Sequence, residues 1–597
     1  MSFNNPTYPG VYTRLEADVP RTITGVSTSI TAFVGRALRG PIGAKKIFSR
    51  TEYDRLFGGL WKDSMMSYAV YDYFLNGGSE AIICRVFAGK RLHEEQITPE
   101  LNISDGRGRF KINGTDGPPF VAHNPGQWSK NLQIVLSKLD SNFEEDELAN
   151  EDDPKYFANL EITDSYTGIT ERHLKVSLKG SNPRYIGKIL KSYSNILRLE
   201  GFVETEGGVD LILDPAQEFI GYYPVTDSFK ERIATRFGLE ATDSKLKEIK
   251  LVKVKLDGEE SEVDSANDGE MLTENHVDGI EPTSAPGENR TQILLKDIDR
   301  LSMSLDESSN LKMGLRILED DVELFNILSI PPYTPDGEWY RIYKKALPVC
   351  EKRRAFLLVD PKREWNTSDK PLDSGDLKVL RHRNSGVFFP RIMKRDPADE
   401  FRIKDFVPSG AVAGIFARTD ANIGVWKAPA GIEATIRGID GLSLKLTEEQ
   451  NGNLNVKAVN CLMDKPLAGP VVWGSRTLKG SDTEGSPWKY IPVIRMGLFI
   501  EESLYRGTQW VVFEPNDEPL WSEIRLSIGA FMHNLFRKGA FQGTSPKEAY
   551  FVKCDKETTT EYDRNSGIVN IVVGFAPLKP AEFVLIKITQ ISGEVNQ

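Results

Sequence analysis

Hydrophobic positions along the chain gather in short runs that predict buried strands, separated by stretches with helical spacing. The runs at residues 30–35 and 81–87 are long enough for strands and contain few polar residues. Between them, apolar side chains recur at intervals of three and four, and Asn76-Gly77-Gly78 supplies a C-terminal stop for the helix that this spacing predicts. The strand–helix–strand order indicates that the fold opens on a βαβ-like unit.

The pattern of buried strands returns after residue 320. We predict strands at residues 324–330, 355–359, 471–473, 568–575 and 583–591. The clearest helix spans residues 517–538, with Asn516 or Asp517 as its N-cap and Gly539 at its end. Its apolar face consists of Leu520, Trp521, Ile524, Ile528, Phe531, Met532 and Leu535. We expect this face to pack on its own domain.

The middle of the chain, residues 96–256, is more polar and contains strands, turns and one good helix. Asn182 is placed to cap that helix and Pro183 to occupy its first turn. The apolar stripe of the helix is predicted to contain Ile186, Ile189, Leu190 and Tyr193. Residues 1–22 differ again: Pro6, Pro9, Gly10 and Pro20 favour an extended arm over a packed element.

A length of 597 residues suggests three or four domains. Charge is unevenly distributed along them. The net charge is −11, but residues 257–290 hold 11 carboxylates with Arg290 as their only basic residue, and residues 144–153 hold 7 with none. Without these 18 carboxylates the chain carries +7. We interpret residues 257–290 as a solvated acidic linker or loop that assembly does not require. Its spacing does not match a calcium loop, and the overall acidity argues against an electrostatic nucleic-acid binder.

Sequence signatures of catalysis are missing. The chain has no phosphate-binding loop, and the nearest mimic, residues 474–480, has the wrong spacing. It has no nucleophile elbow or zinc-protease motif, and its histidines (His93, His123, His173, His276, His382 and His533) are isolated. We therefore predict no catalytic residue, no metal and no cofactor. Two alternatives stay open: an enzyme whose site is assembled from distant residues, and a non-contractile binding or adhesion module.

Location and assembly follow from simpler features. The four cysteines are scattered among apolar neighbours and are expected to be buried thiols in a reducing cytoplasm. The start lacks a signal-peptide pattern, and no apolar run is long enough to span a membrane, so we expect no direct membrane insertion.

Strand-forming segments near both ends would leave unpaired edges. Strand addition to another copy would satisfy them, which favours a structural subunit.

Specific strings then point to a family. The chain resembles contractile tail sheath proteins in YPGVY at 8–12, GVSTSITAFVG at 25–35, FGG at 57–59, FLNGG at 74–78, NPGQWSKNL at 124–132, PSGAVAG at 408–414, ARTD at 417–420, GVWKAPAG at 424–431, VWGSRTL at 472–478, FEPND at 513–517 and APLKPAEF at 576–583. The resemblance covers residues 1–90 and 320–597 well and the middle loosely. It departs at residues 459–463, where the family tends to be more polar and where we expect a surface contact to differ.

The resemblance implies an α+β multidomain fold, in which a mixed α/β sheath core built from N- and C-terminal segments carries an inserted β-rich domain and extended terminal arms. The expected division is an arm (1–22), the first part of the core (23–95), an inserted outer domain (96–256), the acidic linker or loop (257–290), the second part of the core (291–567) and C-terminal strands or an arm (568–597).

The resemblance also implies a mechanism and partners. Sheath subunits stack as hexameric rings around an inner tube, exchange terminal strands and contract to drive the tube through a target envelope. The implied partners are other copies of the chain, the inner tube protein, and baseplate and terminal cap proteins. The implied location is the bacterial cytoplasm at synthesis, and then a phage tail or a released extracellular injection particle. Size and insert favour the injection particle.

Two sets of site residues follow as hypotheses. For strand exchange between subunits we predict Tyr8, Val11, Tyr12, Phe583, Leu585 and Ile588. For the inner-tube contact we predict the cationic positions of the 517–538 helix, namely Arg525, His533, Arg537 and Lys538. Cations at a helix C-terminus also suit the helix dipole.

Overall fold

The computed structural model describes residues 22–41, 43–86, 109–110, 120–124, 128, 132–138, 157–165, 167–199, 219–222, 314–332, 340–373 and 375–582. These residues form two compact units. Unit 1 contains residues 22–28, 419–429 and 485–582, and unit 2 contains the other described residues. The chain passes between the units several times, so each unit is built from segments that are distant in sequence.

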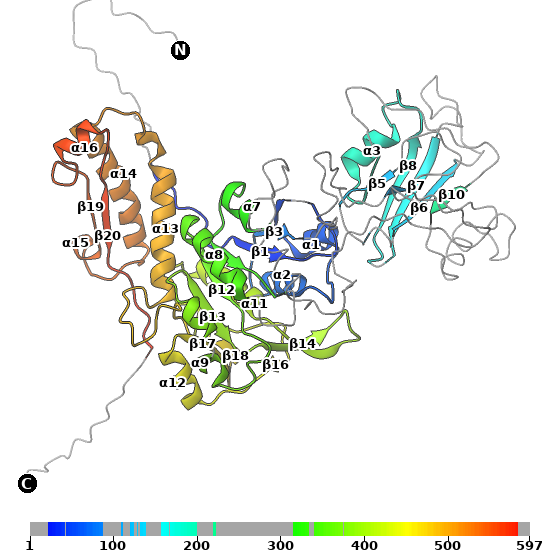
Figure 1. Ribbon diagram of the computed structural model, residues 1–597. Coiled ribbons are helices and arrows are strands. Elements are labelled where there is room, and N and C mark those ends of the chain that lie inside the picture. Colours follow the sequence, from blue (N-terminus) through cyan, green and yellow to red (C-terminus); the bar gives the residue numbers. More distant parts are fainter. Residues whose placement is uncertain are drawn as a thin grey trace, which may run out of the picture. The chain divides into compact units, whose positions relative to one another are not determined.

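Unit 2 is organised around an eight-stranded sheet (Figure 1). Six neighbouring strands run parallel, and an antiparallel strand closes each edge. The order across the sheet is β18 (Gly469–Val472), β17 (Val459–Lys465), β13 (Ser385–Phe389), β12 (Phe356–Val359), β11 (Ile327–Ser329), β1 (Thr31–Gly35), β3 (Ala81–Arg85) and β2 (Ala44–Ile47). The parallel strands are almost entirely buried, as strands covered on both faces must be.

Strand β1 joins the N-terminal segment to the later part of the chain. Thr31 lies opposite Ala81 of β3 on one side and opposite Ile327 of β11 on the other, with all three strands parallel. The expected βαβ opening is therefore present. The core is built from N- and C-terminal segments, as the predicted fold class requires.

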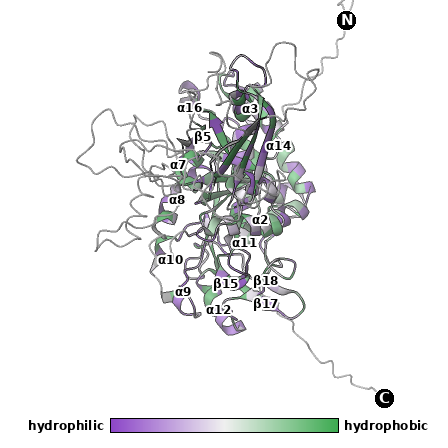
Figure 2. Cartoon of the chain, turned by 90° about the vertical axis from the view of Figure 1, so that its right-hand side faces the viewer, coloured by the Kyte–Doolittle hydropathy of each residue, from purple (hydrophilic) through white to green (hydrophobic). Residues whose placement is uncertain are grey.

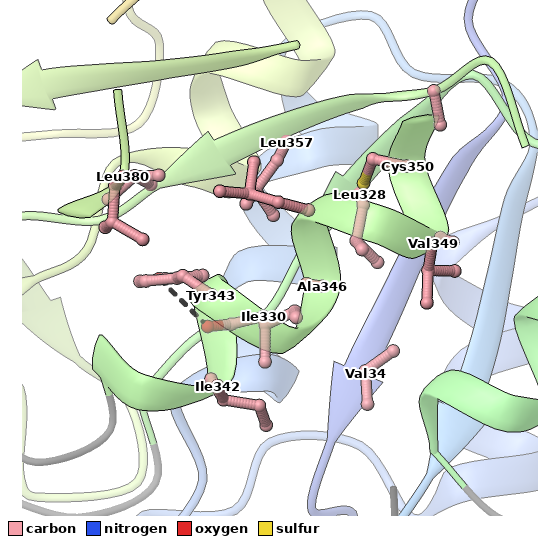
Figure 3. Packing of buried hydrophobic residues seen from close by; sticks show 14 of the residues in the cluster. Val34, Leu328, Ile330, Ile342, Tyr343, Ala346, Val349, Cys350, Leu357 and Leu380 are labelled. Atoms are coloured by element: carbon pink, nitrogen blue, oxygen red, sulfur yellow. Dashed lines mark hydrogen bonds between the residues drawn. The ribbon is translucent and has the colours of Figure 1, made fainter. Parts of the chain in front are cut away.

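Helices cover both faces of this sheet. Those of unit 2 are α1 (Arg50–Phe57), α2 (Met65–Leu75), α7 (Leu315–Asp320), α8 (Tyr340–Lys352), α9 (Lys370–Asp373), α10 (Asp376–Val379), α11 (Ser409–Asn422, which continues into unit 1) and α12 (Glu448–Val456), with the insert helix described below. On one face, α8 packs Ala346 and Cys350 into the cluster that contains Leu328 and Leu357 (Figure 3). On the other face, α2 and α11 contact the sheet through aromatic pairs such as Phe33–Tyr73 and Phe356–Phe416.

A buried polar network lies where β12 ends and α11 begins. The Asp360 carboxylate accepts hydrogen bonds from the Ser409 backbone N–H (3.0 Å) and hydroxyl (2.8 Å), and Ser329 donates to the same hydroxyl oxygen (2.9 Å). Burial raises the pKa of Asp360 to about 7, although the Ser409 hydrogen bonds and nearby Arg391 act in the opposite direction. The carboxyl group therefore titrates near neutrality inside the core.

We expect Asp360 to make the stability of the protein pH-dependent. Between about pH 4, where an unfolded Asp titrates, and about pH 7, the folded chain holds one proton more than the unfolded chain. The Asp360 contribution to the free energy of unfolding therefore falls as the pH rises through this window. Urea unfolding at pH 5 and pH 8 is expected to show a smaller decrease in Asp360→Asn than in the wild type. Equal decreases would contradict this assignment.

The insert is β-rich, as predicted. Its four-stranded sheet has the order β10 (Phe219–Tyr222), β6 (Leu132–Lys138), β7 (Phe157–Asp164) and β8 (Thr170–Ser177), and its three-stranded sheet the order β4 (Arg109–Phe110), β5 (Phe120–Ala122) and β9 (Leu197–Leu199). A separate hydrophobic cluster fills it, with Leu38 and Trp61 as members from the preceding segment. Arg39 also reaches Asp164 across 2.9 Å, with both side chains buried.

The insert helix α3 (Ile186–Tyr193) begins later than predicted. Asn182 does not cap it. Its side chain instead accepts the Arg184 N–H at 2.7 Å, which forms a turn before the helix. Tyr193 does not belong to the buried stripe, because it is 71% exposed at the last helical position. The prediction was right about the helix and wrong about its cap and its final apolar residue.

The expected surface contact at residues 459–463 is also corrected. These residues form the buried part of β17, and Asn460 is fully enclosed between the carbonyl groups of Val387 and Arg476, to which its side chain donates. A separate, three-stranded antiparallel sheet of unit 2 has the order β15 (Arg402–Phe406), β14 (Ile392–Asp396) and β16 (Gly441–Leu442).

Unit 1 is mainly helical. Its elements are α13 (Ile491–Gly507), η6 (Gln509–Val511), α14 (Glu518–Arg537), α15 (Pro546–Ala549), β19 (Tyr550–Lys553), α16 (Glu561–Asn565) and β20 (Val572–Phe575). One hydrophobic cluster holds α13, α14 and the β19–β20 pair together. Of the predicted strand 568–575, only the last four residues are a strand. The predicted strand 583–591, the arm 1–21 and the acidic segment 257–290 lie outside the described residues.

Candidate assembly surfaces

Helix α14 has one buried and one open face. The predicted apolar residues are all buried, and Trp521 and Ile524 lie in the cluster of unit 1. Figure 2 shows the alternation of hydrophobic and hydrophilic residues along this helix. Asp517 precedes the helix in extended conformation. Pro519 lies in the first turn, where a backbone N–H would have no acceptor within the helix, so the lack of this group in proline costs nothing there. This packing fixes which side chains α14 presents outward.

The four cationic residues predicted for the inner-tube contact do not form one cluster. His533, Arg537 and Lys538 are exposed near the C-terminus of α14. Arg525 lies 12 residues before Arg537, about 18 Å along the helix axis. It is half-buried and donates to Glu518 at 2.7 Å and to the Cys554 carbonyl. Arg525 therefore belongs to the internal contacts of unit 1.

The open face of α14 also contains residues that sequence reasoning did not select. Leu526 is 76% exposed and lies opposite the buried face. Ser522, Leu526, Ala530, His533 and Arg537 follow one another at intervals of three or four and are exposed. The sequence contained a signal for this open face, because Leu526 is an apolar residue that does not fit the three-and-four spacing of the buried face. We call these five residues the α14 stripe.

Strands β19 and β20 form a two-stranded antiparallel sheet. Tyr550 lies opposite Phe575, and Lys553 lies opposite Val572. Within the described residues no third strand belongs to this sheet, and Phe551 and Val572 remain about half exposed (51% and 45%). Two-stranded sheets are marginal by themselves. The sheet is therefore suited to accept further strands at its edges.

The N-terminal end of the described chain lies along α13. The Arg495 side chain donates to the Thr28 carbonyl at 2.9 Å, the Val26 N–H donates to the Ser503 hydroxyl at 3.2 Å, and Ile23 packs on Gly507. Residues 23–28 thus run antiparallel to the helix. The first described residues therefore lie at the C-terminal end of α13.

The C-terminal end of the described chain is held at the opposite end of the same helix. After β20, the chain pairs with residues 541–542 through the Phe541–Pro577 bridge and a bond from the Gln542 N–H to the Ala576 carbonyl. Glu582 then accepts a hydrogen bond from the Tyr490 hydroxyl at 3.2 Å and lies 3.8 Å from the Lys489 ammonium group. The next residue, Phe583, is the first of the predicted C-terminal exchange residues.

The predicted strand-exchange residues themselves, Tyr8, Val11, Tyr12, Phe583, Leu585 and Ile588, lie outside the described residues. Among the described residues, no group of three or more His, Cys, Asp or Glu side chains is placed to hold a metal ion. None of the described helices has the length and apolar character to cross a membrane.

Comparisons with known proteins find tail sheath proteins. The family model "Phage tail sheath C-terminal domain" matches residues 483–591, which nearly coincide with the C-terminal part of unit 1. The chain is 27% identical over 284 residues to a putative prophage major tail sheath protein of Pseudomonas aeruginosa, covering 45% of this chain and 67% of that protein. It is 24% identical over 191 residues to the tail sheath protein of Vibrio phage KVP40, covering 32% of this chain and 27% of that protein.

A structural comparison finds the helical sheath of the anti-feeding prophage in its contracted state, at 19% identity and a TM-score of 0.49, covering 98% of this chain and 99% of that one. The similarity to tail sheath proteins rests on the sequence matches, which cover residues 483–591 for the family model and 45% and 32% of the chain for the two relatives. Residues 483–591 therefore match the C-terminal domain of phage tail sheath proteins, and the chain is similar in sequence to tail sheath proteins.

Proposed function

We propose that this subunit polymerises as stacked hexameric rings around an inner tube, and that the sheath contracts to drive the tube through a target envelope. The β19–β20 sheet carries this proposal, because it is a two-stranded sheet in the unit that contains the first and the last described residues of the chain. Strands from neighbouring copies would complete it by β-augmentation. The proposed partners are the inner tube protein, baseplate proteins and a terminal cap protein. The proposed assembly is a phage tail or an extracellular injection particle.

The energy for contraction would reside in contacts between subunits. Two packings of the same folded chain that differ in interface energy make a bistable element. The buried eight-stranded sheet of unit 2 suits a subunit that moves as a body, because a close-packed core does not deform continuously. Terminal strands paired with neighbours would keep the subunits linked while their other contacts change.

Removal of the N-terminal arm tests strand exchange. A chain lacking residues 1–18 is expected to be a soluble, folded monomer that forms no tubes, because residues 23–28 still anchor the chain end on α13 while the exchanged strand is missing. Circular dichroism and negative-stain electron microscopy measure the two properties. Normal tubes from the truncated chain would show that the arm folds back on its own subunit.

We further propose that the α14 stripe, together with Lys538, contacts the inner tube. Its large apolar residue, Leu526, is 76% exposed, and Arg537 and Lys538 at the C-terminal end are exposed as well. Exposed ion pairs contribute only about 0.2–1 kcal/mol each. A contact of this kind holds through many weak pairs and releases when the rings widen.

Charge reversal tests this contact. The double variant Arg537→Glu/Lys538→Glu is expected to form sheath-like tubes but no extended particles filled by the inner tube, since it turns the cationic end of α14 acidic. Co-expression with the tube protein and electron microscopy give the measurement. The control is Lys547→Glu/Lys556→Glu, which changes the net charge equally at exposed positions of the same unit. Extended, tube-filled particles from the α14 variant would rule the contact out.

A further inference from the structure

The turn between η6 and α14 holds an aromatic residue in a conformation that favours glycine. The φ and ψ angles of Val512 are −67° and 127°, and the φ angle of Phe513 is +71°. With the hydrogen bond from the Glu514 N–H to the Val511 carbonyl (3.2 Å), these angles define a type II turn. Its third residue is usually glycine or asparagine, because a larger side chain strains the backbone at positive φ. Phenylalanine is therefore an unfavourable choice for the turn itself.

Packing inside the subunit does not offset this strain. The Phe513 side chain is fully exposed, and Val512 beside it is 59% exposed. A single exposed apolar residue is ordinary, but a strained backbone that presents an aromatic ring to solvent indicates a function for that ring. We call Val512 and Phe513 the apolar turn. Tyr505, in the last turn of α13, adds a further apolar side chain nearby in the chain and is 54% exposed.

The apolar turn is fixed on both sides. Before it, Trp510 packs against the hydrophobic cluster of unit 1. After it, the Asn516 side chain donates to the Ile568 carbonyl (3.0 Å) and accepts from the Trp521 indole N–H (2.9 Å). Phe513 is thus presented by an anchored turn. A partner that covers a preorganised residue loses less conformational entropy on binding than one that must first order a loop.

We propose that the apolar turn docks on a second copy of this chain, an inference that rests on the polymerisation proposed above. The position of the turn favours this occupant. Ile23 packs on Gly507, so the arm assigned to strand exchange is joined to unit 1 at the C-terminal end of α13. The apolar turn follows the same end of α13, directly after η6. A neighbouring copy that pairs with the arm is therefore brought to the end of unit 1 that presents Phe513.

The contact is expected to join different surfaces of the two copies. A ring closes when one surface of each copy binds another surface of the next, whereas two identical turns that face each other would close a two-fold dimer. Aromatic side chains bury a large apolar area and are enriched at such interfaces. Phe513 would therefore act as an anchor in an apolar site elsewhere on its neighbour.

Phe513→Asn separates assembly from folding. Asparagine tolerates positive φ, so the variant is expected to be at least as stable as the wild type in urea. The lowest concentration at which tubes form is expected to rise at least about tenfold, because the anchor is lost. Centrifugation of the tubes measures this concentration. The control is Leu467→Asn, which replaces another fully exposed apolar residue, between β17 and β18, and is expected to leave tube formation unchanged.

A photo-reactive residue at position 513 identifies the partner. Tubes are assembled from a mixture of unlabelled and ¹⁵N-labelled protein that carries p-benzoylphenylalanine in place of Phe513, and are then irradiated. We expect links of mixed isotope, from residue 513 to a different region of a second copy. Links within one chain only would overturn the proposal. So would links that form only to a co-expressed inner tube protein.

The two variants also distinguish this docking from the sheath function itself. Tubes of Phe513→Asn that form at the wild-type concentration would overturn the docking and leave the sheath function standing. A Phe513→Asn chain less stable than the wild type would show that the ring serves the fold, which also overturns the docking. A wild-type chain that forms no tubes would contradict the sheath function and the docking together.

Discussion

Replacing Gly410 by alanine is expected to lower the free energy of unfolding by about 3 kcal/mol, the upper part of the usual range for overpacking. A Cβ atom at this position would lie 2.0 Å from the Ala69 carbonyl oxygen and 2.5 Å from its carbonyl carbon. These are backbone atoms of the buried helix α2, so the neighbour cannot rotate away. Helices α2 and α11 would have to separate, and α11 also contacts Phe356 and Phe388 of the sheet through Phe416.

Helix propensity alone predicts the opposite sign. Alanine favours a helix over glycine by about 1 kcal/mol, and Gly452 in α12 has no atom within 4 Å of its missing Cβ. Gly452→Ala is therefore the matched control and is expected to stabilise the protein by up to about 1 kcal/mol. Urea unfolding of the two variants measures the difference. Equal stabilities would show that α2 and α11 do not pack this closely.

Breaking the Arg495–Asp420 pair is expected to have the second large effect. Arg495 donates to both carboxylate oxygens (2.9 and 2.6 Å), and both side chains are only 3% exposed. Arg495→Met would leave the Asp420 charge buried without its partner, at a cost of about 3–5 kcal/mol. The same substitution removes the bond to the Thr28 carbonyl, so it also loosens the attachment of residues 23–28 to α13.

A double variant separates the two effects. Arg495→Met/Asp420→Leu removes both charges, and a buried ion pair replaced by apolar residues is often neutral for stability. Thermal unfolding is expected to show most of the lost stability restored, while tube formation remains weakened because Thr28 has still lost its anchor. A double variant as unstable as Arg495→Met would mean that the pair acts through packing and not through charge.

The sequence predicted those elements whose physics is local. Parallel strands covered on both faces are uniformly apolar, so residues 30–35, 81–87 and 355–359 were recognisable without knowledge of their neighbours. The buried face of α14 followed from helical spacing in the same way. In both cases, the burial of an element can be read from its own residues: a continuous apolar run for the strands and helical spacing for α14.

Features that depend on which of several possible partners the fold selects were predicted less well. Asn182 has the chemistry of a cap, but an earlier turn uses its side chain. Arg525 was interpreted as a surface cation, but Glu518 lies about two turns before it on the same helix, and the fold brings the Cys554 carbonyl to it. The division between the units after Arg418, inside α11, leaves no composition signal because the helix itself is continuous.

The candidate assembly surfaces were predicted in part. The cationic end of α14 was visible in the sequence, whereas Leu526 was passed over because a single apolar residue on a polar face is ordinary. The role of α13, which holds residues 23–28 at one end and Glu582 at the other, required the structure, because these contacts join positions more than 450 residues apart at one end and about 90 at the other.

Electron microscopy of the purified full-length chain, expressed without partners, tests the central claim most directly. A sheath subunit with an intact β19–β20 sheet and both arms is expected to form tubes built of stacked six-fold rings. In a three-dimensional reconstruction, strands from neighbouring copies should extend the β19–β20 sheet. Tubes whose β19–β20 sheet contains only strands of its own chain, or a chain that stays monomeric at every concentration, would contradict the account.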